Sequence, residues 1–126
     1  MRVVDTSAWI EWLRGTPAGV TLRDHIPRPE EWIVPTMVQL ELAKWLTREM
    51  GDEVSDNALG RTQTLIVAPL HTSTAMLAAE LSVTHRLSTA DAVIYATTHE
   101  LNAELLTCDA HFEGLPRVIY VPNKPN

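Results

Sequence analysis

The sequence predicts an α/β fold of three layers, in which helices cover both faces of a mostly parallel central sheet. Short apolar runs, typical of buried strands, alternate along the chain with longer segments whose apolar residues recur at helical spacing. Strands that alternate with helices usually form parallel sheets, because each helix returns the chain to the same edge of the sheet. A chain of 126 residues predicts a single domain over 1–126, which buries roughly two-thirds of the surface that its unfolded form exposes.

The first strand and the two helices after it come from the N-terminal segment. Arg2 to Val4 has the apolar character of a short buried strand. The following run, SAWIEWL (7–13), places its large apolar residues at helical spacing, and Gly15 interrupts it. A second short helix is predicted from Gly19 to His25.

The second strand and the third helix follow in the same way. Trp32 to Val34 is an apolar strand that ends at Pro35. Thr36 is predicted to cap the next helix, with Gln39 three residues later completing a capping box. Gly51 is predicted to end this helix.

The remaining elements continue the alternation. Thr72 or Ser73 is predicted to cap the helix that runs to about His85, and Thr89 the helix after it. The predicted ranges are a polar helix over 52–61, a strand over 65–68, helices over 72–85 and 90–99, and strands over 104–107 and 118–121.

Four acidic residues fall where such a fold carries its functional sites, at the carboxyl ends of the strands. Asp5 directly follows the first strand, and Asp109 lies just beyond the strand that ends in Thr107. Asp91 lies in the first turn of its helix, and Glu41 lies in the second turn of another. The four acids therefore come from four separate elements that can meet at one edge of the sheet.

Each acid alone has an ordinary structural explanation. Asp5 and Asp91 can be helix caps, and Asp109 can be a simple turn residue. Glu41 can reach solvent or pair with Lys44, three residues later on the same helical face.

Together, the acids favour a metal site. Two carboxylates about 4 Å apart repel by about 4 kcal/mol at an effective dielectric constant near 20, so a cluster needs a cation. Ligands that are all oxygen favour hard ions such as Mg²⁺, which can activate water and stabilise an anionic phosphoryl transition state. Ser7 and Thr107 offer hydroxyl groups that can support the acids or contact a water on the metal.

The same residues carry a family resemblance. The chain resembles PIN-domain proteins, and in particular the VapC-type toxin ribonucleases of type II toxin–antitoxin pairs. The matching segments are VVDTSAWIEWLRG (3–15), VQLELAKWL (38–46) with Glu41, LSTADAVIYATTHE (87–100) and LLTCDAHF (105–112). They occur in the order and at the spacing of the family, so the resemblance spans essentially the whole chain.

This resemblance implies a function and its components. It implies a Mg²⁺ site, with Mn²⁺ as a possible substitute, in which Asp5, Asp91 and Asp109 are metal ligands and Glu41 completes the catalytic acids. It further implies cleavage of RNA phosphodiester bonds by metal-activated water, inhibition by a cognate antitoxin, and assembly as a homodimer. His111 departs from the family pattern, because many relatives carry a further acid at that position.

The four tryptophans, beside one Phe and two Tyr, are an unusual feature of the composition. Core packing explains at least one of them, but exposed apolar surface beside a site would mark a groove for a partner. The resemblance implies that an antitoxin segment lies across this region. The expected groove consists of Trp9, Trp12, Leu13, Trp45 and Leu46.

Other classes of function fit less well. A receiver-like signalling domain would share the size, the Mg²⁺ and a Lys–Pro pair such as Lys124–Pro125, but its phospho-accepting Asp is missing after the third strand. A phosphatase of the Asp-x-Asp type would need an acid where Ser7 stands. A catalytically inert binding module would tolerate loss of the acids, and all four are present.

Charge and composition narrow the setting. The net charge of −6 argues against a general nucleic-acid coat, which needs a surplus of Lys and Arg, but it does not exclude a nuclease. Cys108 is the only cysteine, which excludes an internal disulfide. The chain shows no signal-peptide pattern and no apolar run of the ~20 residues that a membrane helix needs, so a cytoplasmic location is expected.

Overall fold

The computed structural model describes residues 1–123, and the Lys124–Pro125 pair lies outside that range. Within it, five strands form one sheet in the order β3-β2-β1-β4-β5, and all four pairings are parallel. The predicted three-layer α/β/α fold is therefore confirmed, with a sheet that is wholly parallel. The strands are β1 (Arg2–Val4), β2 (Trp32–Pro35), β3 (Ile66–Ala68), β4 (Glu104–Thr107) and β5 (Val118–Tyr120).

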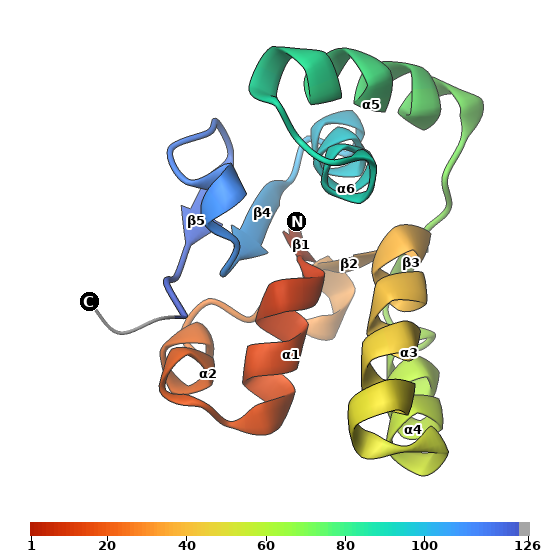
Figure 1. The fold of residues 1–126 in the computed structure, drawn as a ribbon, viewed down its shortest axis with the longest axis vertical. Coiled ribbons are helices and arrows are strands. Elements are labelled where there is room, and N and C mark those ends of the chain that lie inside the picture. The colour runs from red at the N-terminus through yellow and green to blue at the C-terminus, as the bar shows by residue number, and fades with distance from the viewer. Residues whose placement is uncertain (124–126) are drawn as a thin grey trace.

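Helices cover both faces of this sheet. Figure 1 shows α5 and α6 on one side and the helices α1 to α4 on the other. Two short 3-10 turns, η1 (Pro29–Glu31) and η2 (Ala110–Phe112), lead into β2 and out of β4. The α-helices are α1 (Thr6–Arg14), α2 (Pro17–Leu22), α3 (Thr36–Met50), α4 (Asp52–Thr62), α5 (Thr72–His85) and α6 (Thr89–Glu100). None of the helices within residues 1–123 is long and apolar enough to cross a membrane.

The central strands have continuous apolar sequences because they lie in the hydrophobic core. Val3 and Val4 of β1, and Leu105 and Leu106 of β4, are fully buried because helices cover both faces of the sheet. Helix α6 is buried around its whole circumference over 92–98, since α5 packs on its outer side. Its sequence, AVIYATT, therefore lacks the polar face of a surface helix.

Several predicted helix caps are wrong by one residue or in their chemistry. The α3 helix begins after Pro35 without a side-chain cap, and Gln39 donates to the hydroxyl of Thr62 instead of closing a capping box. Ser88, rather than Thr89, caps α6 by accepting a hydrogen bond from the backbone of Asp91. A Ser–Thr pair offers the same hydroxyl at both positions, so sequence alone does not separate them.

Two further helix starts also differ from the prediction. The α2 helix covers Pro17–Leu22 rather than 19–25, because Thr16 caps it and Pro17 suits the first helical position. His71, and not Thr72 or Ser73, occupies the N-cap position of α5, where its backbone N–H donates to Thr74 Oγ1 at 3.3 Å. Histidine is a rare cap, which explains why the sequence pattern did not indicate it.

The strand order creates a switch point between β1 and β4. From β1 the chain proceeds through β2 to β3 on one side, and then returns to place β4 on the other side of β1. The carboxyl ends of adjacent parallel strands diverge at such a point into helices on opposite faces, which leaves a crevice there. Asp5 and the Thr107–Asp109 segment both lie at this edge.

Candidate metal centre

Asp5 is placed by the end of β1 and held by two hydroxyl groups. It occupies the position before α1, but its side chain makes no capping hydrogen bond. Instead its Oδ2 accepts hydrogen bonds from Ser7 Oγ and Thr107 Oγ1, both at 2.8 Å. The carboxylate is 3% exposed, so the side chain is buried among polar groups at the switch point. The simple explanation of Asp5 as a helix cap is therefore wrong.

The same two hydroxyls connect the ends of β1 and β4. Ser7 Oγ accepts from the backbone N–H of Cys108 at 3.0 Å, and Thr107 Oγ1 accepts from the N–H of Asp109 at 2.9 Å. Each hydroxyl thus accepts from one strand end while it donates to Asp5. The network fixes the backbone that carries Asp109 relative to the carboxylate of Asp5.

Glu41 projects from the second turn of α3 and is half-buried. Its Oε1 accepts a hydrogen bond of 2.8 Å from Thr6 Oγ1, the first residue of α1. Within residues 1–123 it forms no ion pair with Lys44, which is exposed. Thr6 was not among the predicted site residues, because it is separated from Glu41 by 35 positions and no local pattern links the two.

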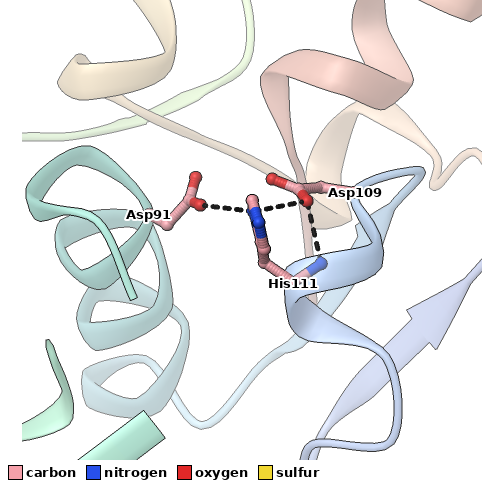
Figure 2. A group of neighbouring side chains, drawn as sticks. All are labelled: Asp91, Asp109 and His111. Carbon is pink, nitrogen blue, oxygen red and sulfur yellow. Dashed lines mark hydrogen bonds and ion pairs between the residues drawn. The ribbon is translucent and has the colours of Figure 1, made fainter. Parts of the chain in front are cut away.

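Asp91, Asp109 and His111 form the other part of the centre (Figure 2). One ligand atom from each lies within 4.8 Å of the others. His111 Nδ1 is 3.1 Å from Asp109 Oδ1 and 3.8 Å from Asp91 Oδ2, so the imidazole lies between the two carboxylates. The sequence indicated that His111 is near the site but gave it no role as a ligand.

The charges of neighbouring acids act on both Asp91 and Asp5. Burial, then the negative charges of Asp5, Asp109 and Glu41, raise the pKa of Asp91 to about 7. Burial also raises the pKa of Asp5 to about 6, although the hydrogen bonds from Ser7 and Thr107 oppose that rise. Carboxylates that repel each other in a buried setting favour either a proton or a cation among them.

The donor set fits a divalent metal ion. In the described part of the chain, no Lys or Arg side chain lies within ion-pair distance of the four acids Asp5, Glu41, Asp91 and Asp109. Among the described residues, His111 is the only basic group within that distance of any of them. Carboxylate oxygens from separate elements are the ligands that Mg²⁺ and Mn²⁺ prefer in proteins. The uncompensated charge and the raised pKa values therefore both agree with a cation site.

The structure corrects the predicted partner groove. Trp9 and Leu46 are fully buried and belong to the hydrophobic core, so neither presents surface to a partner. The ring centroids of Trp9 and Trp32 are 4.7 Å apart. Trp32 lies on β2, so it packs against the face of α1 that points toward the sheet. Helical spacing identified these residues as apolar but could not show which of them face the sheet.

The remaining members of the predicted groove are accessible. Trp12 and Trp45 are half-buried, and Leu13 is exposed. Arginine side chains lie over both indoles, with Arg61 5.0 Å from the Trp12 ring and Arg14 5.9 Å from the Trp45 ring. A surface hollow of about 440 Å³ adjoins the second pair, and it is lined by Arg14, Trp45, Glu49 and Met50.

Comparison with known proteins agrees on the fold. A toxin–antitoxin complex from Klebsiella pneumoniae contains a chain of 18% identity and TM-score 0.79, over 94% of this chain and 96% of that one. VapC20 of Mycobacterium tuberculosis, described as a sarcin–ricin loop cleaving toxin, has 20% identity and TM-score 0.79, over 97% and 100%. VapBC-1 from nontypeable Haemophilus influenzae has 18% identity and TM-score 0.72, over 96% of each chain. At these identities the likeness concerns the fold.

Sequence comparison supplies the family. No curated protein matches the chain at a significant level. The model of the PIN domain matches residues 2–118, a range that contains β1 to β4 and all four acids of the centre. The chain therefore belongs to the PIN domain family.

Proposed function

We propose that this protein is a metal-dependent endoribonuclease and acts as the toxin of a type II toxin–antitoxin pair. The observation that carries the proposal is the convergence of four carboxylates at the switch point, without a Lys or Arg partner in the described part of the chain and with raised pKa values at Asp5 and Asp91. The description of VapC20 as a toxin that cleaves the sarcin–ricin loop supports RNA as the class of substrate.

In this proposal the four acids have different roles in metal binding and proton transfer. Asp5, Asp91 and Asp109 would hold Mg²⁺ or Mn²⁺, which supplies an activated water and offsets charge on the phosphoryl group. Ser7 and Thr107 keep the Asp5 carboxylate in one orientation through their hydrogen bonds. Glu41, oriented by Thr6, is a carboxylate at the edge of the cluster that can take the proton of the attacking water.

The surface charge bears on how RNA is recognised. With a net charge of −6, the chain gains little from counterion release over a broad surface, so binding should depend on a few local contacts. Lys44 is our preferred phosphate contact, because it is exposed on the same helix as Glu41. Mutation can test whether three further cationic side chains contribute to RNA binding: Arg14, Arg48 and Arg86.

The direct test is cleavage of total cellular RNA by the purified protein. We expect discrete fragments with Mg²⁺ or Mn²⁺ and none with a chelator. Asp5→Asn and Asp91→Asn should each abolish cleavage while the fold persists, because each substitution removes a charge and almost no volume. Asp56→Asn, on the exposed face of α4, is the matched control and should cleave normally.

The same preparation separates the nuclease from a catalytically inert PIN-like module. A thermal melt with Mn²⁺ should show a raised midpoint for the unsubstituted chain, since ligand that binds only the folded state stabilises it. An unchanged midpoint together with intact RNA would refute the nuclease and favour the binding module.

Regulation by an antitoxin is the second part of the proposal. Several of the structural neighbours are toxin–antitoxin complexes, which supports such a partner. Its inhibitory segment would lie over Trp12, Leu13 and Trp45, and could direct an arginine at the acids in place of the metal, because a guanidinium binds carboxylates in a bidentate manner. Assembly as a homodimer remains a prediction, which sedimentation of the purified chain would test.

A further inference from the structure

His111 lies within the acidic centre although its side chain is 77% exposed. Its Nδ1 is 3.1 Å from Asp109 Oδ1 and 3.8 Å from Asp91 Oδ2, and Figure 2 shows the ring directed between the two carboxyl groups. A surface histidine without such neighbours would be free to point into solvent. Here a nitrogen donor occupies the space in which the two acids would share a cation.

The backbone holds His111 in this place. Its N–H donates to Asp109 Oδ1 at 2.9 Å, so Asp109 caps the η2 turn that carries the histidine. The next residue, Phe112, is fully buried and lies 5.8 Å from the ring of Tyr95 on α6. Since α6 also carries Asp91, this packing anchors the turn to the helix of the opposing carboxylate.

We propose that His111 is a metal ligand through Nδ1 and shifts the selectivity of the centre from Mg²⁺ toward Mn²⁺ and Co²⁺. This inference rests on the proposed metal-dependent function. Mg²⁺ strongly prefers oxygen donors, whereas imidazole binds the later divalent ions more tightly. A chain with an aspartate at this position would offer oxygen donors alone.

The geometry is close to that of a bound ion. Ligand atoms at about 2.1 Å from one ion lie within about 4.2 Å of each other, and those of Asp91, Asp109 and His111 already lie within 4.8 Å. Side-chain rotations that move these ligand atoms by less than about 1 Å would therefore place all three around one ion. Because the ring is largely exposed, Nε2 can carry the proton of the neutral imidazole into water, which leaves the lone pair of Nδ1 for the metal.

The test is calorimetric titration of the metal-free chain with Mg²⁺, Mn²⁺ and Co²⁺. We compare the unsubstituted chain with His111→Asp and His111→Gln. The ratio of the Mg²⁺ to the Mn²⁺ dissociation constant should fall by about tenfold or more in His111→Asp, in line with the usual effect of a changed metal-site residue. His111→Gln should lose Co²⁺ affinity most, because it removes the nitrogen donor.

A matched control is His25→Gln. The backbone carbonyl of His25 accepts from Arg2 at the start of β1, which places His25 at the opposite edge of the sheet. This variant should keep the metal selectivity of the unsubstituted chain. A change in selectivity equal to that of His111→Gln would overturn the inference.

A spectroscopic readout identifies the ligand directly. The electron spin-echo spectrum of bound Mn²⁺ should carry modulation from a coordinated imidazole nitrogen, and His111→Asp should lose it. Metal binding with equal selectivity in all variants and no nitrogen modulation would overturn the role of His111 and leave the proposed nuclease standing. Absence of any metal binding by the unsubstituted chain would overturn both.

Discussion

The ionisation of Asp5 and Asp91 costs the fold free energy. Burial and neighbouring negative charge raise their pKa values to about 6 and about 7, from an ordinary value of 3.8. At a pH between the ordinary and the raised pKa values, Asp5 and Asp91 are protonated in the folded chain but ionised in the unfolded chain. The free energy of unfolding of the metal-free protein should therefore fall as the pH rises from about 4 to about 7.

The prediction at this scale concerns Asp91→Asn in the metal-free protein. One pKa unit corresponds to about 1.4 kcal/mol, so removal of the charge should raise the midpoint of thermal unfolding at pH 8 by about 4 °C or more. At pH 4 the two proteins should melt together, because the native aspartate is then protonated. Thermal melts across this pH range, monitored by circular dichroism, provide the measurement.

Asp56→Asn again serves as the control, because its parent side chain is exposed on α4. Its midpoint should follow that of the unsubstituted chain at every pH. Equal midpoints for Asp91→Asn and the unsubstituted chain at pH 8 would show that the acids do not destabilise one another.

At the scale of elements, α1 and α2 approach each other closely at Gly19. A Cβ atom added to Gly19 would lie 2.2 Å from the carbonyl oxygen of Glu11 and 3.3 Å from Cα of Trp12. Both atoms belong to the backbone of α1, so neither can rotate away. Glycine is needed here for space, since it allows the α2 helix to pack directly on its neighbour.

Gly19→Ala should therefore destabilise the fold. We expect a loss of about 2 kcal/mol or more, which is typical of overpacking where the backbone must shift. Gly60→Ala is the matched control, because Gly60 lies inside α4 with nothing within 4 Å of the added atom. That variant should gain up to about 1 kcal/mol from the better helix propensity of alanine, and urea unfolding would measure both. A stable Gly19→Ala would contradict the close packing.

For the whole molecule, periodicity and strand ends were sufficient to predict much of the architecture. The strands were recognisable because both faces of the sheet are buried, which gives runs such as Val3–Val4 and Leu105–Leu106 their uniform apolar character. The convergence of Asp5 and Asp109 followed from the rule that parallel strands share a carboxyl edge.

The remaining features depend on contacts between distant segments. Thr6 meets Glu41, and Thr107 meets Asp5, across 35 and 102 positions. The burial of Trp9 depends on Trp32 of β2, which the spacing along α1 cannot reveal. His111 lies near Asp91 on a turn whose next residue, Phe112, packs near Tyr95 of α6. Contacts of this kind can be identified only from the folded structure, because the residues are far apart in the sequence.

The tryptophans provide the prediction for the assembled molecule with its partner. Trp45→Ala should weaken the complex with the proposed antitoxin by at least about tenfold, because truncation of an aromatic anchor commonly costs about 2 kcal/mol. The isolated chain should remain folded, since Trp45 is only half-buried. Trp9→Ala should instead destabilise the chain itself by about 3–5 kcal/mol, as is usual for a large core side chain.

Calorimetric binding and a thermal melt of each variant distinguish the two cases. If Trp45→Ala binds the partner as tightly as the unsubstituted chain, the surface over α1 and α3 is not the binding site.

The position of the candidate site at the switch point between β1 and β4 also determines when during synthesis the site can form. Asp5 leaves the ribosome before β4, which pairs with β1, and before Asp109. Closure of so distant a pairing is a late event in folding. On the proposed function, an incomplete translation product that stops before β4 has the first acid but cannot assemble the nuclease, so a cell that aborts synthesis of this protein is spared its activity.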